Sequence, residues 1–258
     1  MTMKAAAIVL CVLLLLAVIG YWGLHVAPKP MAPYSGASPE LETVPLPAGL
    51  PAPVQRFYQT SLGDRVPVVE TAVITARGHM RLFGLWIPHR MRIIHQAGQG
   101  YYTVIQPTFF GYPVITLFDT YLKGVAHVDQ PGFPDNHPKM NSASNLALWA
   151  ESVDLPSIYL TDPRVRWEPI DQTHARLVVP SPEGSDSFAV TFDETTGLIA
   201  AMEALRWRNP GDTAKSRWKT AATNGLGQVT WNDEAPWFEM KVEQVLLNVD
   251  VSQYVGLQ

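Results

Sequence analysis

The sequence predicts a mainly β (α+β) fold, in which a curled antiparallel sheet or half-barrel meander carries one long helix packed on it, preceded by a single transmembrane helix. Three observations lead to this prediction. A long uncharged run opens the chain, short apolar–polar alternations recur between turn-rich segments, and one stretch has helical apolar spacing. We divide the chain into an anchor at 1–26, a proline-rich spacer at 27–50 and a single β-rich domain at 51–258.

Composition excludes several classes of protein. Hydrophobic residues make up 47% of the 258 residues and charged residues 16%, which is unlike a disordered chain. The net charge of −4 leaves no basic excess for nucleic acid, so we expect no nucleic-acid partner. The one cysteine, Cys11, excludes an internal disulfide and a CxxC redox pair.

The opening segment predicts a membrane anchor. The run from Ala5 to Leu24 has no charge and, as a helix, is about 30 Å long, the thickness of a bilayer's hydrocarbon core. Tyr21 and Trp22 lie at the outer end of this run, where the membrane interface favours aromatic rings. A cleaved signal peptide is the alternative, but its apolar region would be shorter and would end in small residues. We favour an uncleaved anchor that contacts the membrane through residues 5–24. The tail before the span is too short to be a domain, so we expect the large C-terminal part to cross the membrane and face the non-cytoplasmic side.

The segment after the anchor predicts an extended spacer. Residues 27–53 hold eight prolines, a density that excludes helix interiors and favours polyproline II at about 3 Å per residue. A proline-motif ligand for another domain is the alternative interpretation. We expect a semi-rigid spacer that holds the domain off the membrane.

The rest of the chain predicts one short helix followed mainly by strands. Pro51 to Leu62 has a helical stripe, and Gly98-Gln99-Gly100 predicts a hairpin turn. The last strand changes its apolar phase, which predicts a bulge near Glu243-Gln244. Strands are predicted at Val69–Arg77, Arg90–Gln96, Tyr101–Gln106, within Tyr112–Val128, and at Val165–Ile170, Ala175–Val179, Ser187–Phe192, Leu198–Arg208, Ser216–Thr223, Gln228–Asn232 and Trp237–Val249.

One long helix interrupts the strands. Asn141 to Asp154 places apolar residues along one face, Asn141 or Ser142 can cap its start, and Leu155-Pro156 stops it. Short connections on either side imply a large antiparallel sheet curled around this helix.

Residues 145–177 resemble an uncharacterised bacterial family that pairs an N-terminal membrane segment with a domain of unknown function. The motifs that carry the resemblance are Glu151, Leu155-Pro156, Trp167-Glu168, Asp171 and Ala175-Arg176, with Leu50 to Tyr58 and Arg206-Trp207-Arg208 also similar. It extends over about residues 50–250, and 209–236 departs from the pattern. It implies a fold like the curved half-barrel of lipoprotein-carrier proteins. Together with the anchor and its orientation, it leads us to expect a single-pass protein of a bacterial cytoplasmic membrane with a periplasmic domain. It implies no catalytic residue.

The search for chemistry favours a non-enzymatic domain over an enzyme. The sequence has no G-x-S-x-G or H-E-x-x-H motif and no S-x-x-K with its companion motifs, and we expect no cofactor. A curled sheet has a concave face too large for one helix, so an apolar groove could bind a lipid or other hydrophobic ligand. For each aromatic candidate, packing in the hydrophobic core is the alternative role. The candidate ligand-binding residues are Phe109, Phe110, Tyr112, Trp149, Trp207, Glu151, Arg206 and Arg208.

Among these, Glu151 lies on the flank of the helix's apolar face. We expect it to be partly desolvated and paired with Arg206 or Arg208, more as a structural ion pair than as a tuned acid. Loss of such a partner costs about 3–5 kcal/mol, which we expect for Glu151→Ala.

The functional hypothesis is a membrane-anchored extracytoplasmic domain that binds an apolar ligand or an envelope partner. The alternative is an envelope hydrolase or metal-dependent enzyme using the 127–137 loop, whose potential metal ligands are His127, Asp129, Asp135 and His137. Their spacing matches no known metal loop, so we favour a solvated loop without metal. His79, His89 and His95 are expected at the surface or hydrogen-bonded.

Overall fold

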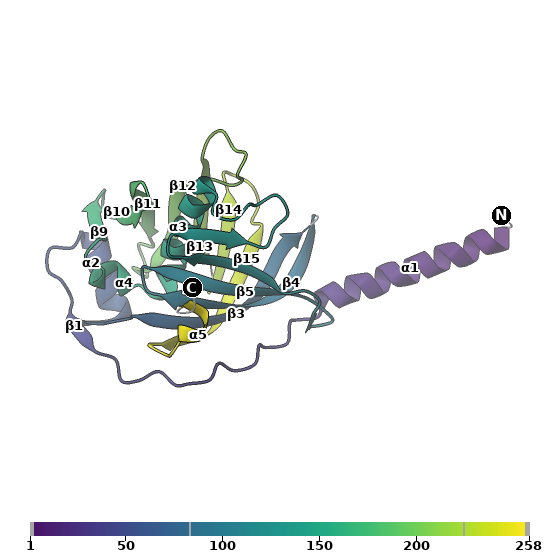
Figure 1. Cartoon of the computed structure of the whole chain (residues 1–258), viewed down its shortest axis with the longest axis horizontal. Helices are drawn as coiled ribbons and strands as arrows, with labels where there is room; N and C mark the ends of the chain where they lie inside the picture. Colours follow the sequence, from purple (N-terminus) through teal and green to yellow (C-terminus); the bar gives the residue numbers. More distant parts are fainter. Residues whose placement is uncertain (1–2, 83, 224, 256–258) are drawn as a thin grey trace.

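The computed structural model describes residues 3–82, 84–223 and 225–255 (Figure 1). Helix α1 (Met3–His25) projects from the β-rich domain, and none of its apolar window is buried. By length and composition α1 can cross a membrane, and a signal sequence would pass the same test. Within the described residues no other helix meets this criterion.

A large antiparallel sheet forms the body of the domain (Figure 1). Its strands are β3 (Thr71–Leu82), β4 (Leu85–Gln96), β5 (Gly100–Phe109), β6 (Tyr112–Pro113), β7 (Leu117–Leu122), β8 (Val125–Val128), β9 (Arg166–Pro169), β10 (His174–Ser181), β11 (Gly184–Phe192), β12 (Ile199–Arg206), β13 (Ser216–Thr223), β14 (Leu226–Trp231) and β15 (Phe238–Leu247). The order β8-β7-β5-β4-β3-β15-β14-β13-β12-β11-β10-β9 places one meander on each side of the β3–β15 pair, and β6 pairs with β5. Strands β8 and β9 are the two edges, so the sheet is open. The predicted curled antiparallel sheet is confirmed.

The β3–β15 pair joins the two meanders at the centre of the sheet. Its register passes from Val242 to Gln244, which leaves Glu243 as the extra residue of a bulge. Arg77 Nε, across on β3, donates a 2.7 Å hydrogen bond to Glu243 Oε1. The bulge predicted from the change of apolar phase is therefore confirmed. Gly78 faces the carbonyl of Glu239 so closely that a Cβ would collide with it.

Around β3 and β4 the sheet is covered on both faces. Ile74 and Ile93 are fully buried on the concave side, while Val73 and Ile94, which alternate with them, are buried on the convex side. Residues 250–255, including the short helix α5 (Ser252–Val255), pack on the convex side. This double cover explains the nearly continuous apolar sequence of these strands.

Helix α3 (Pro138–Glu151) packs on the concave face and continues into a 3-10 turn, η1 (Ser152–Asp154). Every residue from 142 to 150 is buried, because the sheet curls around the helix. The helix starts three residues before the predicted cap, with Pro138 in its first turn and His137 before it. Asn141 serves a different purpose: its Oδ1 accepts a 2.9 Å hydrogen bond from the backbone N–H of Ala126. The predicted stop at Leu155-Pro156 is confirmed.

Three small elements fill one end of the domain. The predicted short helix is present as α2 (Ala52–Ser61), and α4 (Ile158–Thr161) was not predicted. The hydroxyl of Tyr58 in α2 donates a 2.7 Å hydrogen bond to the carbonyl of Pro156, which ties α2 to the end of the α3 segment. A two-stranded sheet, β1 (Thr43–Pro45) with β2 (Arg65–Pro67), lies beside them.

Residues 27–42, which we call the strap, run along the outside of the domain (Figure 1). Arginine side chains of β3 and β4 donate hydrogen bonds to strap carbonyls: Arg77 to Pro28, Arg90 to Lys29 and Pro30, and Arg92 to Ala32. Tyr34 is 8% exposed, and its hydroxyl donates a 2.6 Å hydrogen bond to the carbonyl of Asp250. The segment is extended as predicted, but it lies on the domain instead of holding the domain at a distance.

Candidate functional site

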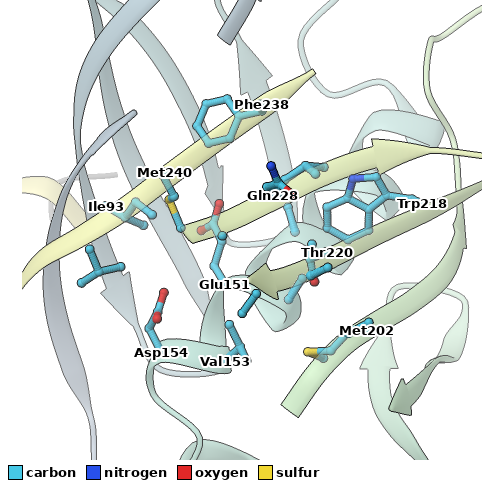
Figure 2. A pocket seen from close by; sticks show the side chains of 18 of the residues that line it. Ile93, Glu151, Val153, Asp154, Met202, Trp218, Thr220, Gln228, Phe238 and Met240 are labelled. Atoms are coloured by element: carbon cyan, nitrogen blue, oxygen red, sulfur yellow. The ribbon is translucent and has the colours of Figure 1, made fainter. Parts of the chain in front are cut away.

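The concave face contains a cavity of about 340 Å³ between the C-terminal end of α3 and the sheet (Figure 2). Ala147, Ala150, Glu151, Val153 and Asp154 line it from the helix side. Strands β4, β5 and β7 form one wall and strands β12 to β15 form the other. The volume is within the range of small-molecule sites, about 300–1,000 Å³.

The walls of the cavity are mostly apolar. Successive side chains of a strand point to opposite faces of the sheet, and most of those that point into the cavity are apolar. On one side the register sets Met91 beside Ile105 and Ile93 beside Thr103. On the other side the inward residues are Met202, Trp218, Thr220, Val229, Phe238, Met240 and Val242. Figure 2 shows Phe238 and Met240 on one side of Glu151, with Trp218 and Thr220 on the opposite side. Such a lining provides apolar contact area with few hydrogen-bonding groups.

Carboxyl groups gather at the α3 end of this cavity. Figure 2 shows Glu151 and Asp154 pointing into the space between the walls. Asp119 reaches the same cavity from β7, where the register places it beside Thr103. Its Oδ1 accepts a 2.9 Å hydrogen bond from the hydroxyl of Tyr101. No group among the described residues donates a hydrogen bond to Asp154.

Burial and mutual repulsion raise the pKa of two of these acids. The pKa of Asp154 rises from 3.8 to about 6, first because the carboxyl is desolvated and second because Glu151 carries the same charge. The pKa of Asp119 also rises to about 6 for the same two reasons, although the Tyr101 hydrogen bond opposes the rise. The charge of Glu151 therefore acts on both aspartates.

Arg206 is the guanidinium that lines the cavity, from β12. Its Nε donates a 2.8 Å hydrogen bond to the carbonyl of Ala143, and its guanidinium lies 4.6 Å from the ring centre of Trp218. Burial lowers the pKa of Arg206. The helix carbonyl and the indole ring thus hold this cation, and no carboxylate among the described residues forms an ion pair with it.

The nearest basic group to Glu151 is a histidine that sequence reasoning placed elsewhere. His95 Nε2, on β4, lies 3.3 Å from Glu151 Oε2. The His95 side chain is fully buried, whereas the Glu151 side chain is 25% exposed. Neither His95 nitrogen has a hydrogen-bond partner among the described residues, nor does Glu151 Oε2. The expected pairing of Glu151 with Arg206 or Arg208 is wrong, because Arg208 instead donates to Glu234 at 2.8 Å.

Most of the other predicted ligand-binding residues lie outside the cavity. Phe110 and Tyr112 are exposed near the end of α1, where the N–H of Phe110 donates to the carbonyl of Gly23, and Phe109 packs against Gly23. Trp149 is fully buried in the core because α3 is enclosed on all sides. Trp207 follows β12, with the ammonium of Lys139 4.8 Å from its ring centre. Of the predicted set, only Glu151 and Arg206 line the cavity.

The 127–137 loop contains a histidine held by carboxylates. His127 Nδ1 lies 2.5 Å from Asp135 Oδ1, and His127 Nε2 lies 3.2 Å from Asp129 Oδ1. These contacts raise the pKa of His127, with the Asp135 hydrogen bond as the largest cause. His137 stands at the start of α3 and makes no such contact. Within the described residues no three His, Cys, Asp or Glu side chains are arranged to hold a metal ion.

Sequence reasoning missed Asp119 and His95 as parts of the site. His89 was also misjudged: it is fully buried against Phe238, and burial lowers its pKa to about 3. Strand alternation could have placed these side chains on one face. The strand register places Asp119 beside Thr103 and Thr103 beside Ile93, two residues before His95, and this pairing is not visible in the sequence.

Comparison with known proteins gives a family and one distant structural likeness. The family of unknown function DUF6544 matches residues 40–230, a span that contains every charged residue of the cavity. No curated protein matches the chain. Among solved structures, the chain is similar to a DUF1329 family protein from Desulfovibrio piger ATCC 29098, with 11% identity, a TM-score of 0.37, and coverage of 80% of this chain and 96% of that one. The predicted membership of an uncharacterised family is confirmed.

Proposed function

This chain belongs to DUF6544, a family of unknown function, and we propose that it is a membrane-anchored, extracytoplasmic domain that binds an apolar, lipid-like ligand in the cavity between α3 and the sheet. The observation that carries the proposal is the cavity itself: about 340 Å³, walled by aliphatic, methionine and aromatic side chains, with charged groups gathered toward the end of α3. Binding sites for small apolar molecules have this composition, because apolar area provides affinity and a few polar groups fix orientation.

The membrane part of the proposal rests on α1 and the strap. None of the apolar window of helix α1 is buried, and large apolar residues from Ile8 to Trp22 are exposed, which suits a lipid environment. The strap is bonded to the domain immediately after α1, as in the hydrogen bond from the N–H of Lys29 to the carbonyl of Gly111. An anchored domain would therefore stay near the bilayer surface. We place it on the periplasmic side of a bacterial cytoplasmic membrane, and protease digestion of intact spheroplasts tests that side.

Photolabelling of the full chain in phosphatidylcholine nanodiscs tests ligand binding. A dodecanol carrying a diazirine at its chain end should label peptides from the end of α3 and from β12 to β15. Thr220→Phe places a ring inside the cavity and should abolish this labelling. Thr230→Phe is the matched control, because Thr230 pairs with Lys219 on the neighbouring strand and faces the other side of the sheet.

The outcomes separate the possible occupants. Labelling confined to α1 and the outer surface, or labelling that Thr220→Phe leaves unchanged, would refute binding in the cavity. Co-purification of a fixed protein partner, lost in Thr220→Phe but kept in Thr230→Phe, would instead assign the cavity to an envelope partner.

A further inference from the structure

We propose that the ligand carries a protonated amine at its polar end, so that the cavity takes a long-chain alkylamine or a related cationic amphiphile with its ammonium among Glu151, Asp154 and Asp119. This inference rests on the proposed function and specifies the chemistry of the ligand. It concerns the polar end of the cavity, whereas the proposed function concerns the apolar walls.

The charge balance of the cavity supports this assignment. Three carboxyl groups and one guanidinium line it. The guanidinium, Arg206, is already engaged by the carbonyl of Ala143 and by the ring of Trp218. An excess of negative charge therefore faces the cavity, and a cation is the group that compensates it in a partly desolvated place.

The carboxyl groups also have hydrogen-bonding capacity left over. The Asp154 carboxyl accepts no hydrogen bond from the described residues, and Glu151 Oε2 is a buried atom without such a bond. Asp119 keeps one oxygen beyond the one that Tyr101 occupies. An ammonium has three N–H donors and no acceptor, which matches a group of acceptors.

Other head groups fit less well. A fatty-acid carboxylate would add a fourth negative charge beside the three acids, and the one guanidinium that lines the cavity, Arg206, already contacts the carbonyl of Ala143 and the ring of Trp218. A simple alcohol offers one donor and brings no charge. Burial and repulsion hold the pKa of both Asp119 and Asp154 at about 6, so both acids are mainly ionised at neutral pH and would be stabilised by an ammonium.

Competition against the diazirine probe tests the inference with the same full chain in the same nanodiscs. Dodecylamine, dodecanol and dodecanoate are compared on the wild type, on the Glu151→Gln/Asp154→Asn double variant, and on Glu183→Gln, an exposed acid in the β10–β11 turn. All variants are measured in nanodiscs of the same lipid, so a given competitor partitions into the bilayer equally in each experiment. This partitioning therefore cancels when the half-inhibiting concentration for a variant is divided by that for the wild type.

We expect the half-inhibiting concentration of dodecylamine to rise about tenfold or more in the double variant, which is the effect of losing charge-assisted hydrogen bonds. Dodecanol should change by less than about twofold, which also shows that the variant is folded and its apolar walls are intact. Glu183→Gln should behave as the wild type.

Two results would overturn the inference: dodecanoate competing as well as the amine, or dodecylamine competing equally on the wild type and the double variant. In both cases dodecanol competition would leave the proposed function standing. If none of the three competes on the wild type, the proposed function itself is wrong.

Discussion

His95 Nε2 lies 3.3 Å from Glu151 Oε2, where helix α3 ends against strand β4. A fully buried imidazole is thus the nearest basic group to the central acid of the cavity. The charge of Glu151 also repels the carboxylates of Asp119 and Asp154. Removal of the Glu151 carboxylate therefore relieves this repulsion and at the same time breaks the contact with His95. The cost of about 3–5 kcal/mol for a stranded arginine does not apply, since no arginine is paired with Glu151.

The first prediction concerns the coupling of these acids. Glu151→Gln should lower the pKa of both Asp119 and Asp154, because the charge of Glu151 is the second cause of the rise in each. Carbon-13 NMR titration of the aspartate carboxyls measures both values. Glu183→Gln serves as the control, and unchanged pKa values in Glu151→Gln would show that the three acids do not interact.

Asp154 should also make stability depend on pH. Its folded pKa of about 6 lies above the ordinary 3.8, so the folded state binds the proton more tightly than the unfolded state. The free energy of unfolding therefore falls as the pH rises from about 4 to about 6, and stays lower above that. Asp154→Asn removes this loss and should gain about 1–3 kcal/mol at pH 8 and little at pH 4. Urea unfolding at both pH values measures the gain.

Asp171 offers a control of opposite sign for that measurement. It is exposed, and its pKa is lowered to about 2, chiefly by the backbone N–H of Thr173 and also by His174. Its charge therefore contributes stability that is present above the ordinary pKa and lost as the pH falls. Asp171→Asn should destabilise at pH 8. Equal behaviour of the two variants would contradict the environment assigned to Asp154.

Gly78 should be intolerant of a side chain. A Cβ at this position would collide with the carbonyl of Glu239 on β15, so Gly78→Ala must displace the central strand pair. We expect a loss of about 2–3 kcal/mol in the free energy of unfolding. Gly211→Ala is the control, because nothing lies within 4 Å of its Cβ position, and it should change stability by about 0.5 kcal/mol or less. A Gly78→Ala protein as stable as the control would contradict the close approach of β3 and β15.

The strap should detach when its one buried ring is removed. Tyr34 packs with Val73 and Ile94 and hydrogen-bonds to the carbonyl of Asp250. Tyr34→Ala should weaken the docking of residues 27–42 by about 3 kcal/mol and speed their cleavage in limited proteolysis. Glu40→Ala, an exposed change in the same segment, should leave the cleavage rate unchanged. Equal rates in the two variants would mean that Tyr34 does not hold the strap on the domain.

Helix α1 should lose membrane integration when charge is placed at its middle. Leu14→Arg together with Leu15→Arg should cost about 2.5–3.5 kcal/mol for each arginine and release the chain from carbonate-washed membranes. Leu14→Ala with Leu15→Ala is the control and should stay in the membrane. A natural protein whose N-terminus begins after residue 25 would identify α1 as a cleaved signal instead.

Features that depend on local pattern were predictable from the sequence. The bulge at Glu243 follows from a change of apolar phase within one strand, and the end of the α3 segment follows from Leu155-Pro156. The first half of β4 was not predicted, and it contains Pro88, a residue that is rare in the interior of a strand. In the structure Pro88 lies within β4, and its carbonyl accepts a 3.2 Å hydrogen bond from the hydroxyl of Thr108.

Features that depend on which segments meet were not predictable. Trp149 was predicted to line a groove, because the concave face of a curled sheet was expected to be too large for one helix, but the sheet encloses α3. No sequence pattern marked Asp119 as a site residue, because its position at the cavity depends on the pairing of β7 with β5, in which Asp119 lies beside Thr103. The strap was predicted to be a free spacer because its proline density indicates an extended chain. The same pattern does not indicate which residues the extended chain contacts.

The pairing of β3 with β15 has a consequence for how the chain matures. His79 and Glu239, partners across that pair, are 160 positions apart in the chain. During synthesis, the N-terminal meander would present the unpaired edge of β3 until the last strand emerged, and such edges recruit other strands. Pairing over this sequence distance is slow to form, because a long loop must close first. Newly made chains are therefore most prone to aggregation in the interval before β15 emerges, and a chaperone that shields the β3 edge would act in that interval.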